Sequence, residues 1–182
     1  MFIALEGGDG TGKSTLTTQL ANHFGGEAYA TPPQKYRRYR EEVDRTSVPK
    51  EHYDFYKESV LDASVEIASI MGQGRHVICD RYWISTVTYH EVMGVDVDLS
   101  DFKQIIKPDL TVLLVTSPGE QIRRMVTRGM SAGDKRMLDK QQEISTRLFQ
   151  NLILSSTPFI SIDTGRFSVD ECVRIIRSAI NL

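Results

Sequence analysis

The glycine-rich segment at residues 7–14 is the part of the sequence whose chemistry is clearest. It satisfies the pattern of glycine, four residues, glycine, lysine and serine or threonine, with Thr15 next. Its residues are Gly7, Gly8, Asp9, Gly10, Thr11, Gly12, Lys13 and Ser14. Glycines let the backbone N–H groups of such a loop surround phosphate oxygens, and the helix expected after it adds a positive N-terminal end. We therefore expect bound ATP, with Lys13 at its β- and γ-phosphates and the Ser14 hydroxyl on Mg²⁺.

A second candidate lies where the apolar run 76–80 ends in Asp80, Arg81 and Tyr82. A carboxylate at the carboxyl end of a neighbouring strand faces the same crevice as the glycine loop, so Asp80 could hold Mg²⁺ directly or through water. Arg81 offers a bidentate fork to a second phosphate. The alternative is a surface ion pair at the end of a strand. In the helix expected next, Ser85, Thr88 and Tyr89 recur on one side and could meet a substrate or only pack.

Short apolar runs alternate with helical patterns, which is typical of a parallel sheet with crossover helices. The sequence predicts strands at 2–6, 27–30, 76–80, 110–115 and 159–163, and helices at 13–24, 51–71, 119–128, 138–154 and 168–180. Residues 32–33 and 129–134 are predicted loops. No repeat or linker divides the chain, so we expect one α/β domain over residues 1–182.

Composition argues against several partner classes. The chain has 182 residues, 40% hydrophobic and 25% charged, with a net charge of −2, which gives no general attraction to nucleic acid or anionic membranes. No apolar stretch approaches the ~20 residues that span a bilayer. Cys79 and Cys172 are predicted to be reduced core residues, and we expect a cytoplasmic protein. The four histidines lack metal-ligand spacing. His90 could border the nucleotide, but a position at the surface is predicted.

Four segments together resemble the thymidylate kinase family. Residues 6–15 resemble its opening, and residues 80–90 resemble its D-R-Y-x-x-S-x-x-A-Y-Q segment. Residues 108–120 resemble its fourth-strand pattern, and residues 162–164 fit the segment before its last helix. The resemblance implies a three-layer P-loop fold with a five-stranded parallel sheet and a mobile lid. It also implies a homodimer that transfers the γ-phosphoryl group of ATP to dTMP.

The same resemblance implies roles for individual residues at the acceptor site. Asp9 would contact the sugar 3′-hydroxyl, Arg81 the acceptor phosphate and Tyr89 the face of the sugar. Asp80 would lie at Mg²⁺ and the acceptor phosphate. In the helix predicted at 51–71, Tyr56 falls where the family stacks an aromatic ring on thymine. Val60 falls where the family places an arginine that recognises the base, so the base preference stays open.

Besides the one replaced by Val60, two further arginines of the family pattern are missing. After the second strand the chain has residues 31–34, Thr-Pro-Pro-Gln, in place of a T-R-E-P segment. One of the nearby Arg37, Arg38 and Arg40 could substitute, with Arg37 as the candidate, or all three could form a solvated surface. Gly10 replaces an arginine that some members carry in the loop. A lid at about residues 124–140 would then supply the charge, through Arg124 or Arg128, which share a helix face.

Two other functions compete with a nucleoside monophosphate kinase. The first is a deoxynucleoside kinase, which phosphorylates a hydroxyl and usually needs a carboxylate after the second strand; a related P-loop nucleotide kinase with another base preference is kept beside it as an alternative. Residues 30–33, Ala-Thr-Pro-Pro, offer no such carboxylate. A nucleotide-binding protein without turnover is the third candidate. Guanine-specific switches carry an N-K-x-D motif, which is absent here.

Overall fold

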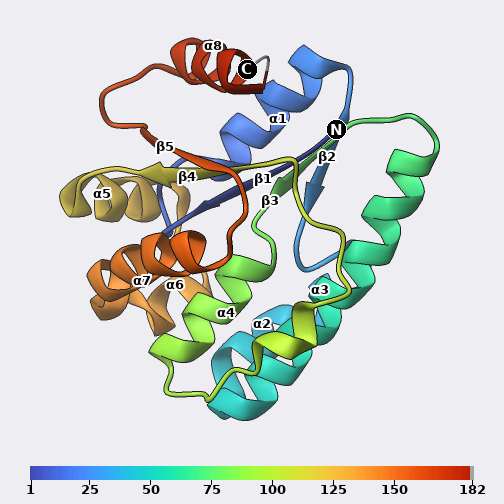
Figure 1. The fold of residues 1–182 in the computed structure, drawn as a ribbon. Coiled ribbons are helices and arrows are strands. Elements are labelled where there is room, and N and C mark those ends of the chain that lie inside the picture. Colours follow the sequence, from blue (N-terminus) through green and yellow to red (C-terminus); the bar gives the residue numbers. More distant parts are fainter. Residues whose placement is uncertain (181–182) are drawn as a thin grey trace.

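A five-stranded parallel sheet forms the centre of the molecule (Figure 1). The computed structural model describes residues 1–180. Its strands are β1 (Phe2–Gly7), β2 (Glu27–Ala30), β3 (Val77–Asp80), β4 (Leu110–Val115) and β5 (Phe159–Asp163). They lie in the order β2-β3-β1-β4-β5, and each adjacent pair is parallel. The predicted parallel sheet is confirmed.

Helices cover both faces of this sheet. They are α1 (Lys13–Phe24), α2 (Arg37–Thr46), α3 (Pro49–Gly72), α4 (Trp83–Val92), α5 (Pro118–Arg128), α6 (Ala132–Arg136), α7 (Gln141–Leu154) and α8 (Val169–Ile180). Short 3₁₀ turns occupy Gln34–Tyr36, Leu99–Phe102 and Leu138–Lys140. Figure 1 shows α1 and α8 on one face and α3, α4 and α7 on the other. No helix within residues 1–180 is long and apolar enough to cross a membrane.

Alternation along β1 fills two separate cores. Ile3 and Leu5 pack in the cluster beneath α1 and α8, whereas Phe2 and Ala4 belong to the cluster beneath α3, α4 and α7. Successive side chains of a strand point to opposite faces, so a strand covered on both faces is apolar throughout. Cys79 and Cys172 are buried free thiols, one in each core, as predicted.

Two segments differ from the sequence prediction. The structure has a helix, α2, where none was predicted. Sequence analysis missed it because the segment Arg37–Thr46 is polar and has no apolar stripe, and only Asp44 in it is buried. The predicted loop at 129–134 is wrong in its second half, because α6 begins at Ala132. There the Ser131 side chain caps the Asp134 N–H and the Asp134 carboxylate accepts from the Ser131 N–H. The helix predicted at 138–154 begins with the 3₁₀ turn Leu138–Lys140.

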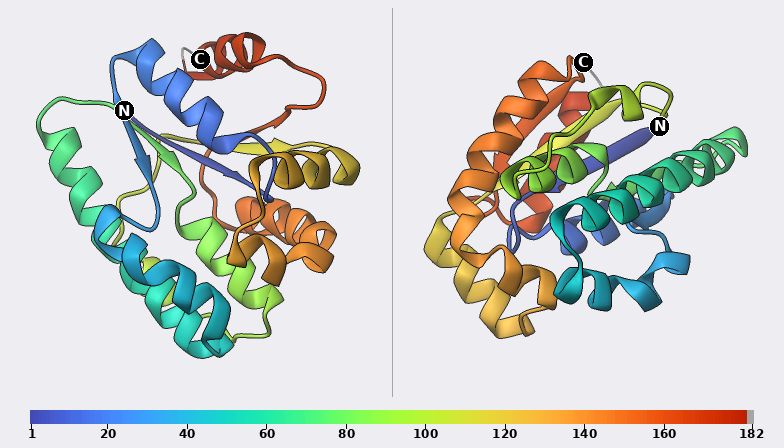
Figure 2. Two further views of the ribbon diagram at one scale, coloured as in Figure 1. Left: turned by 180° about the vertical axis from the view of Figure 1, so that it is seen from behind. Right: turned by 90° about the horizontal axis from the view of Figure 1, so that it is seen from below.

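The strand order places the predicted chemistry at one edge. In β3, Asp80 pairs with Leu5 of the adjacent β1, so the two strands end together and both lead into loops at the carboxyl edge. Helices α2 and α6 contact each other beyond this edge, as the views in Figure 2 show. The site is therefore enclosed by the phosphate loop, the end of β3 and this helix pair.

Candidate active site

The phosphate loop joins β1 to α1 and is held by its own side chains. The Thr11 hydroxyl donates to the Gly8 carbonyl oxygen over 2.9 Å. The Lys13 ammonium donates to the carbonyl oxygens of Gly7 and Gly8 over 3.1 and 2.7 Å. Burial, with repulsion from the Arg81 charge, lowers the pKa of Lys13 to about 8 despite nearby carboxylates. Phosphate oxygens would replace these carbonyls as acceptors for Lys13.

Gly10 is required by the packing of α5 against the loop. Its φ of 78° is in the left-handed region, and a Cβ there would lie 2.5 Å from the Gln121 carbonyl oxygen. Any side chain would collide with this backbone atom. The loop therefore cannot carry an arginine at this position while α5 packs here.

Ser14 and Asp80 lie together where α1 begins and β3 ends. The Ser14 hydroxyl donates to one carboxylate oxygen of Asp80 over 2.5 Å. The other Asp80 oxygen is buried and has no hydrogen-bond partner within residues 1–180. A hydroxyl beside a carboxylate with an unpaired buried oxygen is an oxygen-donor set that suits Mg²⁺. The two predicted metal ligands therefore fit the ion.

Arg81 joins the predicted acceptor residues into one network. Its φ of 65° turns the chain from β3 into the cavity, and its side chain is 17% exposed. The guanidinium donates to Asp9 over 2.5 Å, to the Ser85 hydroxyl over 3.1 Å and to the Tyr89 hydroxyl over 3.1 Å. Of the two alternatives left open for Thr88, packing is the one observed, because Thr88 is buried and accepts from Asn151.

Asp9 is kept ionised by this network. Burial alone would raise the pKa of its carboxyl, but the charges of Arg81 and Lys13 outweigh it and lower the pKa to about 2. Gln141 and Tyr89 donate to the same carboxylate over 3.2 and 3.0 Å. Asp9 and Tyr89 therefore lie beside Arg81.

Glu6 is a site residue to which sequence analysis assigned no role. Its side chain is buried and accepts from the backbone N–H groups of Tyr82 and Ser85 over 3.0 and 3.2 Å, and from the Ser85 hydroxyl. Burial raises the pKa of Glu6 to about 7, against hydrogen bonds that favour the charged form. Glu6 braces the turn that carries Arg81. The sequence could have indicated this role, because Glu6 is a carboxylate at the end of an otherwise apolar predicted strand.

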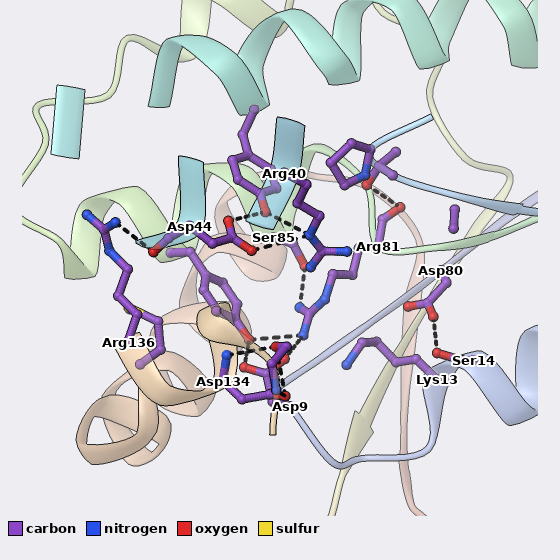
Figure 3. Close-up of a pocket in the computed structure, with 18 of the residues that line it drawn as sticks. Asp9, Lys13, Ser14, Arg40, Asp44, Asp80, Arg81, Ser85, Asp134 and Arg136 are labelled. Carbon is purple, nitrogen blue, oxygen red and sulfur yellow. Dashed lines mark hydrogen bonds and ion pairs between the residues drawn. The ribbon is translucent and has the colours of Figure 1, made fainter. Parts of the chain in front are cut away.

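A cavity of about 510 Å³ extends from the phosphate loop to α2 (Figure 3). Lys13, Ser14 and Asp80 lie at one end, and Asp44 and Arg136 lie at the other. The lining includes the predicted residues Asp9, Gly10, Gly12, Lys13, Ser14, Thr15, Arg37, Tyr56, Asp80, Arg81, Ser85, Tyr89 and Arg128. Val60 is fully buried in the core and does not line it.

The three arginines after β2 differ in their surroundings. Arg37 is exposed and lines the cavity, while Arg38 lies over the ring of Tyr39, 4.5 Å from its centroid. Arg40 is built into the cavity wall, where its Nε donates to the Tyr56 hydroxyl over 3.1 Å. Of the three, Arg40 therefore has the most defined position toward a ligand, although Arg37 was the candidate from sequence.

The lid arginines face different cavities. Arg124 donates to the Thr164 hydroxyl and carbonyl oxygens, both over 3.0 Å, and lines a second cavity of about 200 Å³. Arg128 lines the large cavity and donates to Asp134 over 2.6 Å. Arg136 ties the lid to α2 through the carbonyl oxygens of Asp44 and Ser47, over 3.0 and 2.9 Å.

His90 does not have the predicted surface position. It is 1% exposed and lines the large cavity with His52 and Asp44, which are also buried. Sequence analysis assigned no role to His52 or Asp44. These three residues come from α4, α3 and α2, so no spacing along the chain could have grouped them.

The sheet order, the phosphate loop and the cavity define a P-loop phosphotransferase. The family model for thymidylate kinase matches residues 5–176, and this chain belongs to the thymidylate kinase family. A probable thymidylate kinase of Archaeoglobus fulgidus is 29% identical, over 100% of this chain and 97% of that protein. A thymidylate kinase of Desulfotalea psychrophila is 30% identical, over 96% of this chain and 91% of its own length.

Two solved structures share the fold. Thymidylate kinase from Candida albicans has a TM-score of 0.76 at 20% identity, covering 99% of this chain and 90% of that one. Deoxyadenosine kinase from M. mycoides with bound dATP has a TM-score of 0.74 at 18% identity, covering all of both chains. At these identities the likeness concerns the fold alone.

Proposed function

We propose that this chain is a nucleoside monophosphate kinase that transfers the γ-phosphoryl group of ATP to a deoxynucleoside monophosphate, with dTMP as the first candidate. The observation that carries the proposal is one cavity in which the phosphate loop and Arg81 face each other. Phosphoryl transfer needs charge neutralisation and in-line positioning of two phosphates, and this cavity offers cations for both. Membership of the thymidylate kinase family supports the same acceptor class.

The residues divide into a donor set and an acceptor set. Lys13 and the loop N–H groups would bind the β- and γ-phosphates, and Ser14 and Asp80 would hold Mg²⁺, which neutralises charge on the phosphate oxygens. Arg81, with Arg40 beyond it, would bind the acceptor phosphate. Asp9 and Tyr89 would then lie at the sugar, as the family resemblance implies.

The second cavity suits the base of ATP. Gly12 and Thr15 line both cavities, so the loop connects them. Arg124 and Phe167 line the smaller one, and a guanidinium plane and an aromatic ring both stack on a nucleobase. Arg124 would thus serve the donor, which leaves Arg128 as the lid arginine on the acceptor side.

The part of the cavity where the acceptor base would bind differs from the family pattern. Tyr56 lines the cavity, where its ring can stack on a base, but Val60 is buried and cannot recognise a thymine carbonyl. The Candida albicans structure was described as revealing the origin of that enzyme's broad substrate specificity. A related preference for another deoxynucleoside monophosphate is therefore the second candidate here.

Lid and subunit arrangement follow from the family resemblance. We infer that residues 1–182 act as one kinase domain, that the segment at about residues 124–140 closes as a lid, and that two copies pair through helices outside the sheet. The family match over residues 5–176 supports the first point. Contacts of Arg136 with α2 support the second.

An acceptor screen tests the function. ADP formation from ATP and Mg²⁺ would be followed with dTMP, dUMP, other nucleoside monophosphates and free nucleosides as acceptors. We expect turnover with dTMP or another deoxynucleoside monophosphate, and none above background with nucleosides. Turnover with nucleosides alone would refute the proposal, and ADP formation that no acceptor stimulates would favour a protein without transfer activity.

Gly133 in the lid gives a separate prediction. A Cβ at this position would lie 3.1 Å from a carboxylate oxygen of Asp44, whose position hydrogen bonds from Tyr56 and His52 restrain. Overpacking of this kind costs about 1–3 kcal/mol, so Gly133→Ala should weaken acceptor binding about tenfold when the lid is closed. The measurement is the acceptor KM, with the KM for ATP expected to change less than about twofold.

Gly119→Ala is the matched control, because a Cβ there meets nothing within 4 Å. It should leave both KM values unchanged. An unaltered acceptor KM in Gly133→Ala would show that this lid contact plays no part in turnover.

A further inference from the structure

Three buried titratable side chains from three helices form a chain at the α2 end of the large cavity. The Asp44 carboxylate lies 3.1 Å from Nε2 of His52. Nδ1 of His52 lies 2.8 Å from Nε2 of His90, and Nδ1 of His90 lies 2.5 Å from the Thr86 carbonyl oxygen. Asp44, His52 and His90 are 5%, 5% and 1% exposed. Each contact requires one hydrogen, so the protons can be counted.

The Thr86 carbonyl oxygen determines which nitrogen of His90 carries a hydrogen. A carbonyl oxygen only accepts, so Nδ1 of His90 carries a hydrogen. Burial lowers the pKa of His90 to about 4, so its ring is neutral near pH 7 and holds only that hydrogen. Nε2 of His90 is therefore an acceptor, and the hydrogen in its contact with His52 belongs to Nδ1 of His52.

The other nitrogen of His52 needs a hydrogen as well. Burial would raise the pKa of Asp44, but hydrogen bonds from His52 and Tyr56 and the charge of Arg40 outweigh it, so its pKa lies below the ordinary value. An ionised carboxylate only accepts. Nε2 of His52 must then donate to Asp44, and His52 carries two protons, as an imidazolium.

The pair formed by Asp44 and His52 contacts the residues that line the acceptor end of the cavity. The same Asp44 oxygen accepts from the Tyr56 hydroxyl over 2.7 Å, and Arg40 lies 3.4 Å from the other oxygen. The Tyr56 ring stacks on His52, with centroids 4.7 Å apart and planes at 27°. A fixed Asp44 therefore fixes the ring that would stack on the acceptor base and the arginine beside Arg81.

Other groups around the chain complete the electrostatics. The Tyr53 ring meets His90 edge-on at 5.2 Å, and Tyr53 donates its hydroxyl to Asp101. From the lid, Arg136 donates to the Asp44 carbonyl oxygen, and its charge opposes protonation of His90. Asp44 is the carboxylate that contacts His52, so the second proton of His52 depends on it.

We propose that His52 is a positioning residue for the acceptor nucleotide, held as a buried imidazolium between Asp44 and His90 so that Tyr56 and Arg40 keep their places. Loss of one proton from His52 would set a nitrogen lone pair against the Asp44 carboxylate and release that contact. The acceptor KM then rises with pH. The kinetic part of this inference rests on the proposed function, whereas the protonation state of His52 does not.

Nuclear magnetic resonance of the ring nitrogens tests the protonation state directly. The protein would be labelled with ¹⁵N-histidine, and the signals of His52 would be assigned by their loss in His52→Gln. At pH 7 we expect both nitrogens of His52 to be protonated and His90 to be a neutral Nδ1–H tautomer. An unprotonated ring nitrogen on His52 at pH 7 would overturn the proposal, whatever the acceptor is.

Asp44→Asn tests the positioning role. In the place of the oxygen that contacts both side chains, its amide nitrogen can donate one hydrogen to a neutral His52 and the other to the Tyr56 hydroxyl oxygen, so the second proton is no longer needed. We expect the ratio of the wild-type acceptor KM to that of Asp44→Asn to stay constant while the ring-nitrogen signals show both His52 nitrogens protonated, and to rise by up to about tenfold per pH unit once they show loss of a proton. Ionisation of the acceptor phosphate is common to both enzymes and cancels in the ratio.

Asp62→Asn is the matched control, because Asp62 also accepts from a tyrosine hydroxyl, that of Tyr36, outside the cavity. Its pH profile should parallel the wild type. Parallel profiles of Asp44→Asn and wild type through the loss of the His52 proton, with a working acceptor, would refute the positioning role. If no acceptor is turned over, the proposed function fails, and the ring-nitrogen signals still decide the state of His52.

Discussion

Replacing Lys13 with alanine is expected to reduce the turnover number by about 10²–10³-fold while the fold is kept, because one fixed charge at a developing oxyanion contributes about 3–4 kcal/mol. Lys13 is the only side chain of the phosphate loop whose ammonium can reach the transferred phosphate. Its hydrogen bonds go to the carbonyl oxygens of Gly7 and Gly8 and to the Thr11 hydroxyl, all in the loop, and it belongs to neither hydrophobic core. Turnover at saturating substrates and the far-ultraviolet circular dichroism spectrum are the measurements.

The pH dependence of ATP binding provides a second check on Lys13. Burial and the Arg81 charge lower its pKa to about 8 in the empty site, so the cationic form is lost as the pH rises through that value. Because phosphate favours the cation, the KM for ATP should increase above about pH 8, and binding there should take up a proton. Lys103→Ala, a surface change, is the control, and it should behave like the wild type. Near-normal turnover in Lys13→Ala would refute the proposed mechanism.

Replacing Arg81 with alanine is expected to lower kcat/KM for the acceptor by about 10²–10³-fold, because truncating one member of a buried, hydrogen-bonded charge pair costs about 2–5 kcal/mol. Arg81 is the centre of the network that joins Asp9, Ser85 and Tyr89. The KM for ATP should change much less, because the loop is held by Thr11 and Lys13. Initial rates with each substrate varied in turn measure both effects.

Two variants sharpen this test. Arg81→Lys keeps the positive charge but lacks the planar fork, so it should restore part of the stability and little of the acceptor use. Arg38→Ala removes an arginine that lies over Tyr39 outside the cavity, and it should leave both substrates unaffected. Equal losses for ATP and acceptor in Arg81→Ala would show that the division into donor and acceptor sets is wrong.

The Arg81 variant should also lose stability in a pH-dependent way. The pKa of Asp9 is about 2 in the folded protein and 3.8 ordinarily, so its ionisation stabilises the fold above about pH 4 and this contribution disappears as the pH falls through 2. Without Arg81 the pKa of Asp9 rises, and up to about 2 kcal/mol of this contribution is lost at neutral pH. Denaturant unfolding at several pH values should show the gap from wild type closing toward pH 2.

Local chemistry made much of the donor site predictable. The order of glycines, Lys13 and Ser14 is specific because a phosphate loop uses consecutive residues, and its strand and helix follow from adjacent apolar patterns. Asp80 and Arg81 were found for the same reason, since Asp80 ends a buried strand and Arg81 directly follows it. The five strands were predicted from their own apolar residues, and the family resemblance supplied the order of motifs.

The acceptor wall was less predictable, because its residues are distant in sequence. Asp44 belongs to a polar helix without an apolar stripe, and its burial depends on the lid and α3 packing around it. From the sequence, His90 was expected at the surface, with a position at the border of the nucleotide as the alternative. Only the packing of α4 against α3 places it next to His52.

The sequence by itself therefore determined the sheet, the phosphate loop and the residues that directly follow β1 and β3, since their chemistry is encoded in contiguous segments. Tertiary structure alone decided that, of the two arginines after β2 that line the cavity, Arg40 is held by Tyr56, and that Arg124 and Arg128 face different cavities. It also decided that Gly10 lies against a carbonyl of α5 and that Asp44, His52 and His90 lie within hydrogen-bond distance of one another in a chain. Those outcomes depend on distances between segments far apart in the chain, and such distances are set by how the helices pack.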